Sequence, residues 1–361
     1  MSDDKTSCET IFIHAAIESS FYSLFNLKLN AITKYNMCLI ADIGGTNARF
    51  ALVDEGSATP QHERTLSCAN YRTLVDAVLA YLEDVSQAMP ETASLAIATP
   101  VSKDRIVMTN HAWDLSVEET RKTLGLKSLK VLNDYTALAL ALPYLGDDDC
   151  HKVGRGTAVD KQTMAVLGPG TGLGVSGAIY AGDYWLPLQS EGGHISYGPL
   201  NHRETEIIDV IRKYHNFISA ETLVSGPGLV LLYESIAKCD GVEHELLSPE
   251  QIANKALKGT DVSAAEAVAM FCGILGSIAG NLALTLGARG GVYVGGGIVP
   301  KLGDYFDSSP FRTRFENNGR FSEYLEEIPS NVIISKYPAL IGAAVAVQQQ
   351  YSHLGATSVS G

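Results

Sequence analysis

Hydrophobic and polar residues alternate along the 361-residue chain in two different patterns, which together predict an α/β protein. Short apolar runs such as 38–41 are predicted to be strands, because they end at glycine-rich or polar turns. Longer segments repeat apolar residues every three or four positions. One is 71–86, where Leu74 and Val78 share a face, and this spacing predicts an amphipathic helix. Since strands and helices alternate, we expect sheets covered by helices.

The same patterns assign much of the chain to elements. Strands are predicted over 38–41, 49–53, 95–98, 129–132, 164–167, 175–180 and 292–298. Helices are predicted over 71–86, 135–142, 204–216, 226–238, 249–258, 262–287 and 339–350. Two strand–turn–strand units, at 38–53 and 164–180, resemble each other and lie one in each half of the chain. They suggest a duplicated architecture with a ligand in the cleft between the halves.

One apolar segment, 267–288, has no charged residue and could be mistaken for a membrane span. It is rich in alanine and glycine and contains the spacing Gly276-x-x-x-Gly280, which packs helices closely in membranes. A single such helix in an otherwise soluble chain is better explained as a buried helix packed closely against a sheet. We therefore expect no membrane partner.

Composition and charge narrow the possible functions. The formal net charge is −13, from 27 basic and 40 acidic residues, so no basic surface is expected to bind nucleic acid or anionic lipid. The six cysteines form no Cys-x-x-Cys pair, which disfavours a zinc site and a disulfide framework. Residues 1–36 lack the basic region and the cleavage site of a targeting signal. These features together predict a cytoplasmic protein with reduced thiols.

The first glycine-rich turn, Asp42-x-Gly44-Gly45-Thr46-Asn47, has the composition of a phosphate-binding loop. Glycine lets backbone N–H groups approach an anion closely, and the threonine and asparagine add side-chain donors. Asp42, at the end of the preceding strand, is a candidate to hold Mg²⁺ through water. The alternative is an ordinary hairpin with a polar turn.

A second turn of this kind is Gly168-Pro-Gly-Thr-Gly172. It overlaps the spacing Gly172-x-Gly174-x-x-Gly177, which matches the dinucleotide-binding fingerprint. That fingerprint requires a helix after the glycines, whereas 175–180 is predicted to be a strand, so a dinucleotide site is rejected. The chain has no Gly-Lys pair, which excludes a Walker A loop. Two such hairpins can hold one triphosphate from both sides.

Several polar residues beside predicted strands or glycines are candidates for the chemistry. Asn133 and Asp134 follow a strand and begin a helix, so they are either a helix cap or, for Asp134, a base that accepts the proton of a sugar hydroxyl. Glu191 and His194 flank two glycines and can bind neutral hydroxyls. A metal site is disfavoured there because no third ligand has suitable spacing. Glu221, by itself, is an acidic residue near a helix N-terminus.

Seven motifs occur in a fixed order along the chain. They are Asp42-Ile-Gly-Gly-Thr-Asn47, Leu132-Asn-Asp134, Leu167-Gly-Pro-Gly-Thr-Gly172, Ser190-Glu-Gly-Gly-His194, Ser219-Ala-Glu221, Leu223-Val-Ser-Gly-Pro-Gly228 and Tyr293-Val-Gly-Gly-Gly297. This ordered set resembles bacterial-type glucokinase, in the zinc-free group of the hexokinase/actin-like sugar kinases, over about residues 37–350. The zinc-binding cysteine cluster of the related repressor–kinases is missing, which disfavours a sugar-responsive repressor.

The resemblance implies an α/β fold of the two-domain actin-like ATPase (ribonuclease H-like) type with an inter-domain cleft. The small α/β domain is expected to take 37–144 and a returning helix at 338–355, and the large α/β domain 145–337. Residues 1–36 match nothing in the family pattern and are expected to form a disordered extension. A homodimer is expected by analogy.

The resemblance also implies roles for individual residues. Asp134 is expected to be the catalytic base, and the residues expected to bind glucose are Asn133, Asp134, Glu191, His194 and Glu221. The residues expected to contact the nucleotide are Asp42, Gly44, Gly45, Thr46, Asn47, Gly168, Gly170, Thr171, Gly172, Gly295, Gly296 and Gly297. Asp42 is further expected to associate with Mg²⁺, through water.

The activity implied is ATP-dependent phosphorylation of D-glucose at the 6-hydroxyl, the first step of glycolysis, with ATP and Mg²⁺ required. Phosphoryl transfer depends on positioning and charge neutralisation, so Asp134 is expected to take the hydroxyl proton late. A kinase for fructose or mannose is one alternative. An actin-like ATPase with no sugar substrate is another, although it leaves the glucose-binding set unexplained.

Overall fold

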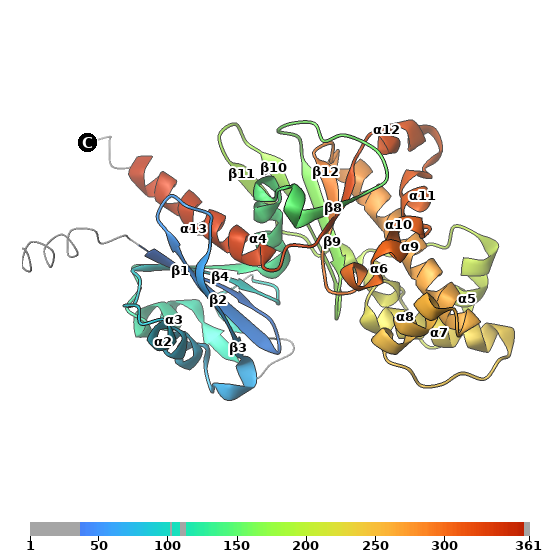
Figure 1. The fold of residues 1–361 in the computed structure, drawn as a ribbon, viewed down its shortest axis with the longest axis horizontal. Helices are drawn as coiled ribbons and strands as arrows, with labels where there is room; N and C mark the ends of the chain where they lie inside the picture. The colour runs from blue at the N-terminus through green and yellow to red at the C-terminus, as the bar shows by residue number, and fades with distance from the viewer. Residues whose placement is uncertain (1–36, 102, 109–112, 357–361) are drawn as a thin grey trace, which may run out of the picture.

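Two β-sheets with helices packed on them form the core of the computed structural model, which describes residues 37–101, 103–108 and 113–356 (Figure 1). The predicted extension at 1–36 lies outside the described residues. Helix α4 (Asp134–Ala141) contacts strands of both sheets and therefore lies between them. The C-terminal helix α13 (Pro338–Ala356) packs along α4.

The first sheet has the strand order β3-β2-β1-β4-β7. Its strands are β1 (Met37–Ile43), β2 (Asn47–Asp54), β3 (Gln61–Ser67), β4 (Thr92–Ile97) and β7 (Ser128–Asn133). β1 forms a hairpin with β2 and runs parallel to β4, which runs parallel to β7. Ile43, Ile97 and Asn133 consequently stand in one row, so the first glycine-rich turn and the start of α4 share an edge of the sheet.

Different helices cover the two faces of this sheet. On one face lie α2 (Leu74–Asp84) and α3 (Val117–Thr123), where Leu39 packs in a cluster with Tyr81. On the other lie α4 and α13, where Ile40 packs in a cluster with Leu340. Neighbouring residues of a strand point to opposite faces, which explains why β1 is apolar from Met37 to Ala41. The C-terminal helix thus returns to the sheet formed by the start of the chain.

The second sheet has the strand order β11-β10-β9-β12-β13-β8. Its strands are β8 (Cys150–Val153), β9 (Met164–Pro169), β10 (Leu173–Tyr180), β11 (Trp185–Leu188), β12 (Gly291–Val294) and β13 (Ser330–Ile333). β9 and β10 form the hairpin that carries the second glycine-rich turn, and β12 runs parallel to β9. The Gly295 N–H donates to the Leu167 carbonyl at 2.8 Å, which brings the 295–297 segment beside that turn.

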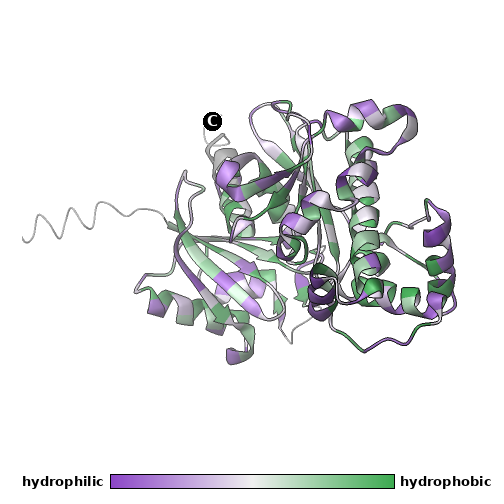
Figure 2. Ribbon diagram, turned by 45° about the vertical axis from the view of Figure 1, so that its right-hand side comes forward, coloured by the Kyte–Doolittle hydropathy of each residue, from purple (hydrophilic) through white to green (hydrophobic). Residues whose placement is uncertain are grey.

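The remaining helices lie in the second half of the chain. A small two-stranded sheet lies in the first half. The helices are α5 (His202–Arg212), α6 (Ala220–Leu223), α7 (Gly226–Asp240), α8 (Pro249–Lys258), α9 (Val262–Leu286), α10 (Asp304–Ser308), α11 (Phe311–Glu316) and α12 (Ser322–Glu326). The two strands are β5 (Arg105–Val107) and β6 (Asp114–Ser116). Figure 2 shows the outer helices marked with both hydrophilic and hydrophobic residues, as amphipathic helices require.

Helix α9 contains most of the apolar segment 267–288. It is long and apolar enough to cross a membrane, yet 72% of its apolar 18-residue window is buried inside the protein, as in the core helix of a soluble protein. The predicted burial is confirmed, but the main partners are helices α7, α8 and α11 rather than a sheet. A Cβ atom on Gly276 or Gly280 would collide with the backbone of α11, so the Gly-x-x-x-Gly spacing permits this close crossing.

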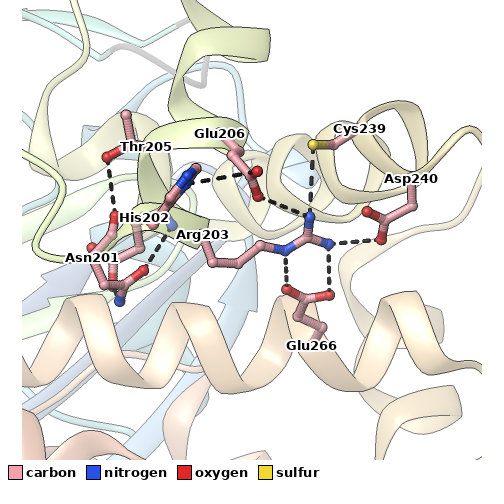
Figure 3. Close-up of polar contacts among 9 residues, drawn as sticks. Asn201, His202, Arg203, Thr205, Glu206, Cys239, Asp240 and Glu266 are labelled. Carbon is pink, nitrogen blue, oxygen red and sulfur yellow. Dashed lines mark hydrogen bonds and ion pairs between the residues drawn. The ribbon is translucent and has the colours of Figure 1, made fainter.

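A network of charged and polar contacts around Arg203 fastens α5 to α7 and α9 (Figure 3). The guanidinium donates to Glu266 and to Asp240, each at 2.7 Å, and a third nitrogen lies 3.7 Å from the Cys239 sulfur. These hydrogen bonds raise the pKa of Arg203. Since its side chain is 33% exposed, the network orients the helices more than it stabilises them.

The long predicted elements are confirmed with shifts at their ends, and the missed elements are short or polar. Helix α8 has the predicted bounds, since Ser248 caps it, Pro249 begins it and Gly259 ends it in the left-handed conformation. The strand predicted over 292–298 ends at Val294. β3 lies at a sheet edge and has the sequence Gln-His-Glu-Arg-Thr-Leu-Ser, so it offers little apolar alternation to detect.

Candidate functional site

A cavity of about 810 Å³ lies where the glycine-rich turns of both hairpins and the start of α4 meet. All the residues predicted to bind glucose line it, namely Asn133, Asp134, Glu191, His194 and Glu221. It is also lined by most of the predicted nucleotide residues, namely Gly44, Gly45, Gly168, Gly170, Thr171, Gly172, Gly296 and Gly297. Positions far apart in the sequence therefore converge on one space.

Asn133 is the N-cap of α4, as the plainer sequence interpretation expects. Its side-chain oxygen accepts hydrogen bonds from the backbone N–H groups of Tyr135, at 2.9 Å, and Thr136, at 3.3 Å. Asp134 is the first residue of the helix, so its carboxylate lies at the positive end of the helix dipole. It accepts a hydrogen bond from the Tyr135 N–H at 2.9 Å. The cap fixes the start of the helix and thereby orients Asp134 at the cavity wall.

Burial raises the pKa of Asp134 to about 6, and the nearby Asp42 carboxylate contributes to the rise. Hydrogen bonds to backbone N–H groups and to Asn133 act in the opposite direction. A carboxyl group with a pKa near 6 is mostly ionised at pH 7 and still accepts a proton readily. This is the behaviour expected of a general base.

Asp42 stands opposite Arg49 in the β1–β2 hairpin and accepts a hydrogen bond from its guanidinium at 2.8 Å. Burial raises the pKa of Asp42, and the charge of Arg49 opposes this rise. Asp42 is not among the residues lining the cavity, but it is close enough to Asp134 to raise the pKa of that residue. The two acids and one arginine thus form a charged group at the end of the first sheet.

The glycines of the β9–β10 turn are required for different reasons. A Cβ atom on Gly174 would collide with the Tyr135 ring, and one on Gly172 would collide with the Glu221 carboxylate. By contrast, no described atom lies within 4 Å of the place where a Cβ on Gly170 would be. The motif therefore combines two packing requirements with one position that is open to a ligand.

Tyr135 links the start of α4 to this turn. Its hydroxyl donates to the Gly168 carbonyl at 2.7 Å. A Cβ atom on Gly168 would collide with that hydroxyl. Burial raises the pKa of the Tyr135 hydroxyl far above its usual range, so the group remains a donor at any physiological pH. Sequence reasoning missed Tyr135, because its position next to Asp134 does not reveal a partner across the cavity.

Glu191 and His194 are held at the two ends of a short turn, the 3₁₀ turn η4 (Gly192–His194) preceded by Glu191. A Cβ atom on Gly193 would collide with the Leu173 carbonyl oxygen, so glycine lets this turn lie against the start of β10. Both polar side chains line the cavity. Within the described ranges, no group of three or more His, Cys, Asp and Glu could hold a metal ion. That Glu191 and His194 bind hydroxyls stays a prediction.

Glu221 reaches the cavity from α6, which Ser219 caps. Ser219 also forms a β-bridge with Ser196, two residues after His194. This pairing brings Glu221 beside His194, whose Nδ1 lies 3.9 Å from Glu221 Oε1. The other carboxylate oxygen, Oε2, accepts a hydrogen bond from the Leu173 N–H at 2.8 Å. Glu221 therefore contacts both His194, a predicted sugar ligand, and the end of the second glycine-rich turn.

Four predicted nucleotide residues do not line the cavity, namely Asp42, Thr46, Asn47 and Gly295. Thr46 and Asn47 shape the first turn through their backbones. The Thr46 carbonyl accepts from the Cys68 N–H at 2.9 Å, and the Asn47 carbonyl accepts from the Gly44 N–H at 2.9 Å. Their direct contact with nucleotide stays a prediction.

Arg49 is a further candidate that sequence reasoning missed. Of the described residues that line the cavity, it is the one lysine or arginine. Transfer of a phosphoryl group requires positive charge near the phosphate oxygens, and Arg49 can supply it. The signal was available in the hairpin register, which pairs Arg49 with Asp42 and places it two residues beyond Asn47.

The fold and the cavity define a class of protein. Each of the two large sheets has a hairpin whose glycine-rich turn borders a shared cavity, and an acidic residue with a raised pKa lines the same cavity. This arrangement suits transfer of a phosphoryl group to a hydroxyl, and it is that of a sugar kinase with the actin-like ATPase fold.

Comparison with known proteins identifies the family within this class. The glucokinase family model matches residues 39–350. The glucokinase of Aromatoleum aromaticum is 50% identical over 310 residues, which cover 86% of this chain and 94% of that protein. The glucokinase of Neisseria meningitidis is 46% identical over 309 residues, with coverages of 86% and 94%. The crystal structure of a glucokinase from an Antarctic psychrotroph is 35% identical and superposes with a TM-score of 0.81, covering 88% of this chain and 100% of that one.

The chain therefore belongs to the glucokinase family. The resemblance found in the seven sequence motifs is confirmed, and so is the expected actin-like fold.

Proposed function

We propose that this protein transfers the γ-phosphoryl group of ATP to the 6-hydroxyl of D-glucose, giving glucose 6-phosphate and ADP. Membership of the glucokinase family supports this activity. The structural observation that carries the proposal is the single cavity lined by Asp134, by the predicted sugar ligands and by both glycine-rich turns. We place the reaction in the cytoplasm, as the first step of glycolysis.

The sugar hydroxyls are bound by the five predicted residues around one end of the cavity. Glu191 and Glu221 accept hydrogen bonds from hydroxyl groups, and the His194 imidazole can donate or accept one. The oxygen of Asn133 is engaged by two backbone N–H groups, and its amide nitrogen donates to the Thr99 carbonyl at 3.4 Å. For Asn133 to bind the sugar, its amide nitrogen has to donate to a hydroxyl as well, or in place of Thr99. A set of this kind fixes the orientation of the ring and hence the position of the reacting hydroxyl.

Asp134 acts on the 6-hydroxyl. The hydroxyl oxygen forms a bond to the γ-phosphorus while the bond from that phosphorus to the β–γ bridging oxygen breaks, so ADP leaves with the electron pair. The proton passes to Asp134 late in the transfer, because the pKa of an alcohol is far above that of the carboxyl group. Asp134 then releases the proton to solvent.

The two glycine-rich turns hold the triphosphate from opposite sides through backbone N–H groups. Mg²⁺ fits this site, because the carboxylates of Asp42 and Asp134 lie close enough together for one to raise the pKa of the other, and the ion commonly binds through one or two carboxylates together with water and substrate phosphates. Asp42 would hold the ion through water, and the ion would supply positive charge to the phosphate oxygens when bound. Arg49 contributes further positive charge at the same end of the cavity.

The two sheets belong, in our proposal, to two domains that close on the substrates, with 37–144 and 338–355 in the smaller and 145–337 in the larger. The packing of α13 on β1, β4 and α4 supports the return of the C-terminal helix to the smaller domain. Closure would expel water and bring the hydroxyl to the γ-phosphate.

We also propose that the protein is a homodimer. The apolar side chains of Leu200, Tyr214 and Phe217, near the ends of α5, are 60%, 71% and 61% exposed, and a second copy could cover them. Sedimentation equilibrium tests this, and a monomer at micromolar concentration would contradict it.

A coupled assay of ADP formation with and without glucose tests the proposed function. We expect ADP to form rapidly only when glucose is present. ADP formation that is indifferent to sugar would instead identify an actin-like ATPase. Faster turnover on fructose or mannose in the same assay would identify a kinase for another hexose.

A further inference from the structure

We propose that Glu221 positions the phosphate-binding turn as well as the sugar, so that one carboxylate couples the two substrate sites. The inference rests on the proposed function, since it takes Glu221 as a sugar ligand. It assigns to the same residue a second role, toward the nucleotide, that follows from its contacts.

The two oxygens of the Glu221 carboxylate face different partners. Oε2 accepts a hydrogen bond from the Leu173 N–H at 2.8 Å, and Leu173 directly follows the glycine-rich turn that ends at Gly172. Oε1 points to the sugar side, 3.9 Å from His194 Nδ1. Hydrogen bonds to an ionised acceptor are stronger than those between neutral groups. The Glu221 carboxylate therefore holds the end of the turn in place through a strong hydrogen bond.

The turn is shaped to admit this carboxylate. A Cβ atom on Gly172 would collide with Glu221 Oε2, so only glycine leaves the carboxylate in its place. The middle of the turn is attached to the same part of the chain, because the Gly226 N–H at the start of α7 donates to the Gly170 carbonyl at 2.8 Å. Glu221 and Gly226, five residues apart, thus hold the turn at two points.

Binding of sugar at Glu221 then affects the nucleotide. Hydroxyls that bind Oε1 restrict the carboxylate and, through Oε2, restrict the turn. When sugar is already bound, the turn is already ordered, so binding of the nucleotide costs less conformational entropy. The nucleotide therefore binds more tightly. Since coupling is reciprocal, bound nucleotide must tighten sugar binding by the same factor.

The first experiment measures ADP binding in the absence of sugar, by calorimetry in the presence of Mg²⁺. Glu221→Ala is expected to weaken ADP binding about tenfold, because the turn loses a charge-assisted hydrogen bond. Glu221→Gln is expected to restore much of this affinity, because its amide oxygen can still accept from Leu173. Glu191→Ala is the matched control. It removes another predicted sugar ligand, which in the described part of the chain makes no hydrogen bond or ion pair to the turn, and it should leave ADP binding within about twofold.

The second experiment is the reciprocal one, glucose binding in the absence of nucleotide. Gly172→Ala should displace the Glu221 carboxylate and weaken glucose binding about tenfold, although residue 172 lies in the phosphate-binding turn. Gly170→Ala, in the same turn but facing open space, should leave glucose binding within about twofold. Neither glycine has a positive φ, so alanine fits the backbone at both positions.

The outcomes separate this inference from the proposed function. If wild-type protein binds no glucose and consumes no ATP with it, the proposed function fails. If wild-type protein phosphorylates glucose but Glu221→Ala leaves ADP affinity unchanged and Gly172→Ala leaves glucose affinity unchanged, the coupling role of Glu221 is wrong and the function stands. Thermal unfolding of each variant confirms that the folded protein is being compared.

Discussion

The neighbours of Asp134 determine both its position and its pKa. Asn133 caps the helix that begins with Asp134, while burial and Asp42 raise the pKa of Asp134 to about 6. The sequence leaves the cap and the base as competing interpretations of this pair. In the structure they are compatible, because a cap fixes the direction in which the first residue of a helix projects.

Replacing Asp134 tests its role as the base. Asp134→Ala should lower turnover about 10²–10⁴-fold, the usual loss for a positioned general base, while glucose binding is largely retained. The coupled assay measures turnover, and calorimetry measures glucose binding. Asp183→Ala, which removes an exposed aspartate of the β10–β11 turn, should leave both unchanged. Near-normal turnover in Asp134→Ala would show that another group takes the proton.

The pKa of Asp134 also predicts a pH dependence. In the proposed mechanism the ionised form of Asp134 is the base, so kcat/KM should be constant well above pH 6 and should fall about tenfold per pH unit below it. Since Asp42 helps to raise this pKa, Asp42→Asn should move the decline to lower pH in whatever activity it retains. A pH–rate profile for each protein gives the answer, and a flat wild-type profile between pH 5 and 7 would contradict the assignment.

Tyr135 is expected to position Asp134 relative to the phosphate-binding turn. Tyr135→Phe removes the hydrogen bond to the Gly168 carbonyl, worth about 0.5–1.5 kcal/mol, and should lower kcat about two- to tenfold. The KM for ATP should rise more than the KM for glucose. Tyr233→Phe removes a hydroxyl that donates to Asp261 outside the cavity, so it should affect thermal stability but not kinetics. If Tyr135→Phe and Tyr233→Phe have the same kcat and KM values, Tyr135 has only a structural role.

Among the elements, α9 shows that the effect of a glycine spacing depends on the helix that packs against it. Gly276 and Gly280 lie where α11 crosses, and its backbone occupies the space that their side chains would fill. Gly273, on the same helix, has its nearest neighbours at ordinary contact distance, 3.5 Å. The sequence predicts that this helix is buried, whereas the identity of the helix packed against it depends on the whole fold.

Two alanine substitutions in α9 test this crossing. Gly276→Ala should lower the free energy of unfolding by about 1–3 kcal/mol, because the added methyl group forces the helices apart. Gly273→Ala should leave stability unchanged or raise it by up to about 1 kcal/mol, since alanine favours helix. Urea denaturation measures both values. Equal effects would mean that α11 can shift to accommodate the methyl group.

For the molecule as a whole, the cavity lies where turns of the two large sheets meet, and we expect these sheets to move relative to each other. The chain passes from the first sheet to the second after α4 and returns before α13. Two connections of this kind suit a hinge, because few segments must bend when the sheets approach.

We expect glucose to close this hinge. The radius of gyration from small-angle X-ray scattering should fall when D-glucose is added, because closure makes the molecule more compact. L-Glucose, with the same composition and the opposite hand, should cause no change. An unchanged radius with D-glucose at saturating concentration would mean that the cavity is already closed in the free protein.

Most long elements and most of the candidate site could be predicted from the sequence. The two hairpins, the helix after Asn133 and the buried apolar helix have local signals: apolar periodicity, capping residues and glycines. Short elements such as β13 and α12 have too few residues to show a period. Arg49 and Tyr135 were missed, because their roles depend on partners across a hairpin and across the cavity.

The sequence alone therefore specifies most of the long strands, helices and turns, and through its ordered motifs the family, because these signals are read within a few neighbouring residues. The contacts of Glu221 with Leu173 and of Tyr135 with Gly168 join residues 48 and 33 positions apart. Only the tertiary structure decides such contacts, since the direction of a side chain depends on how whole sheets and helices pack around it.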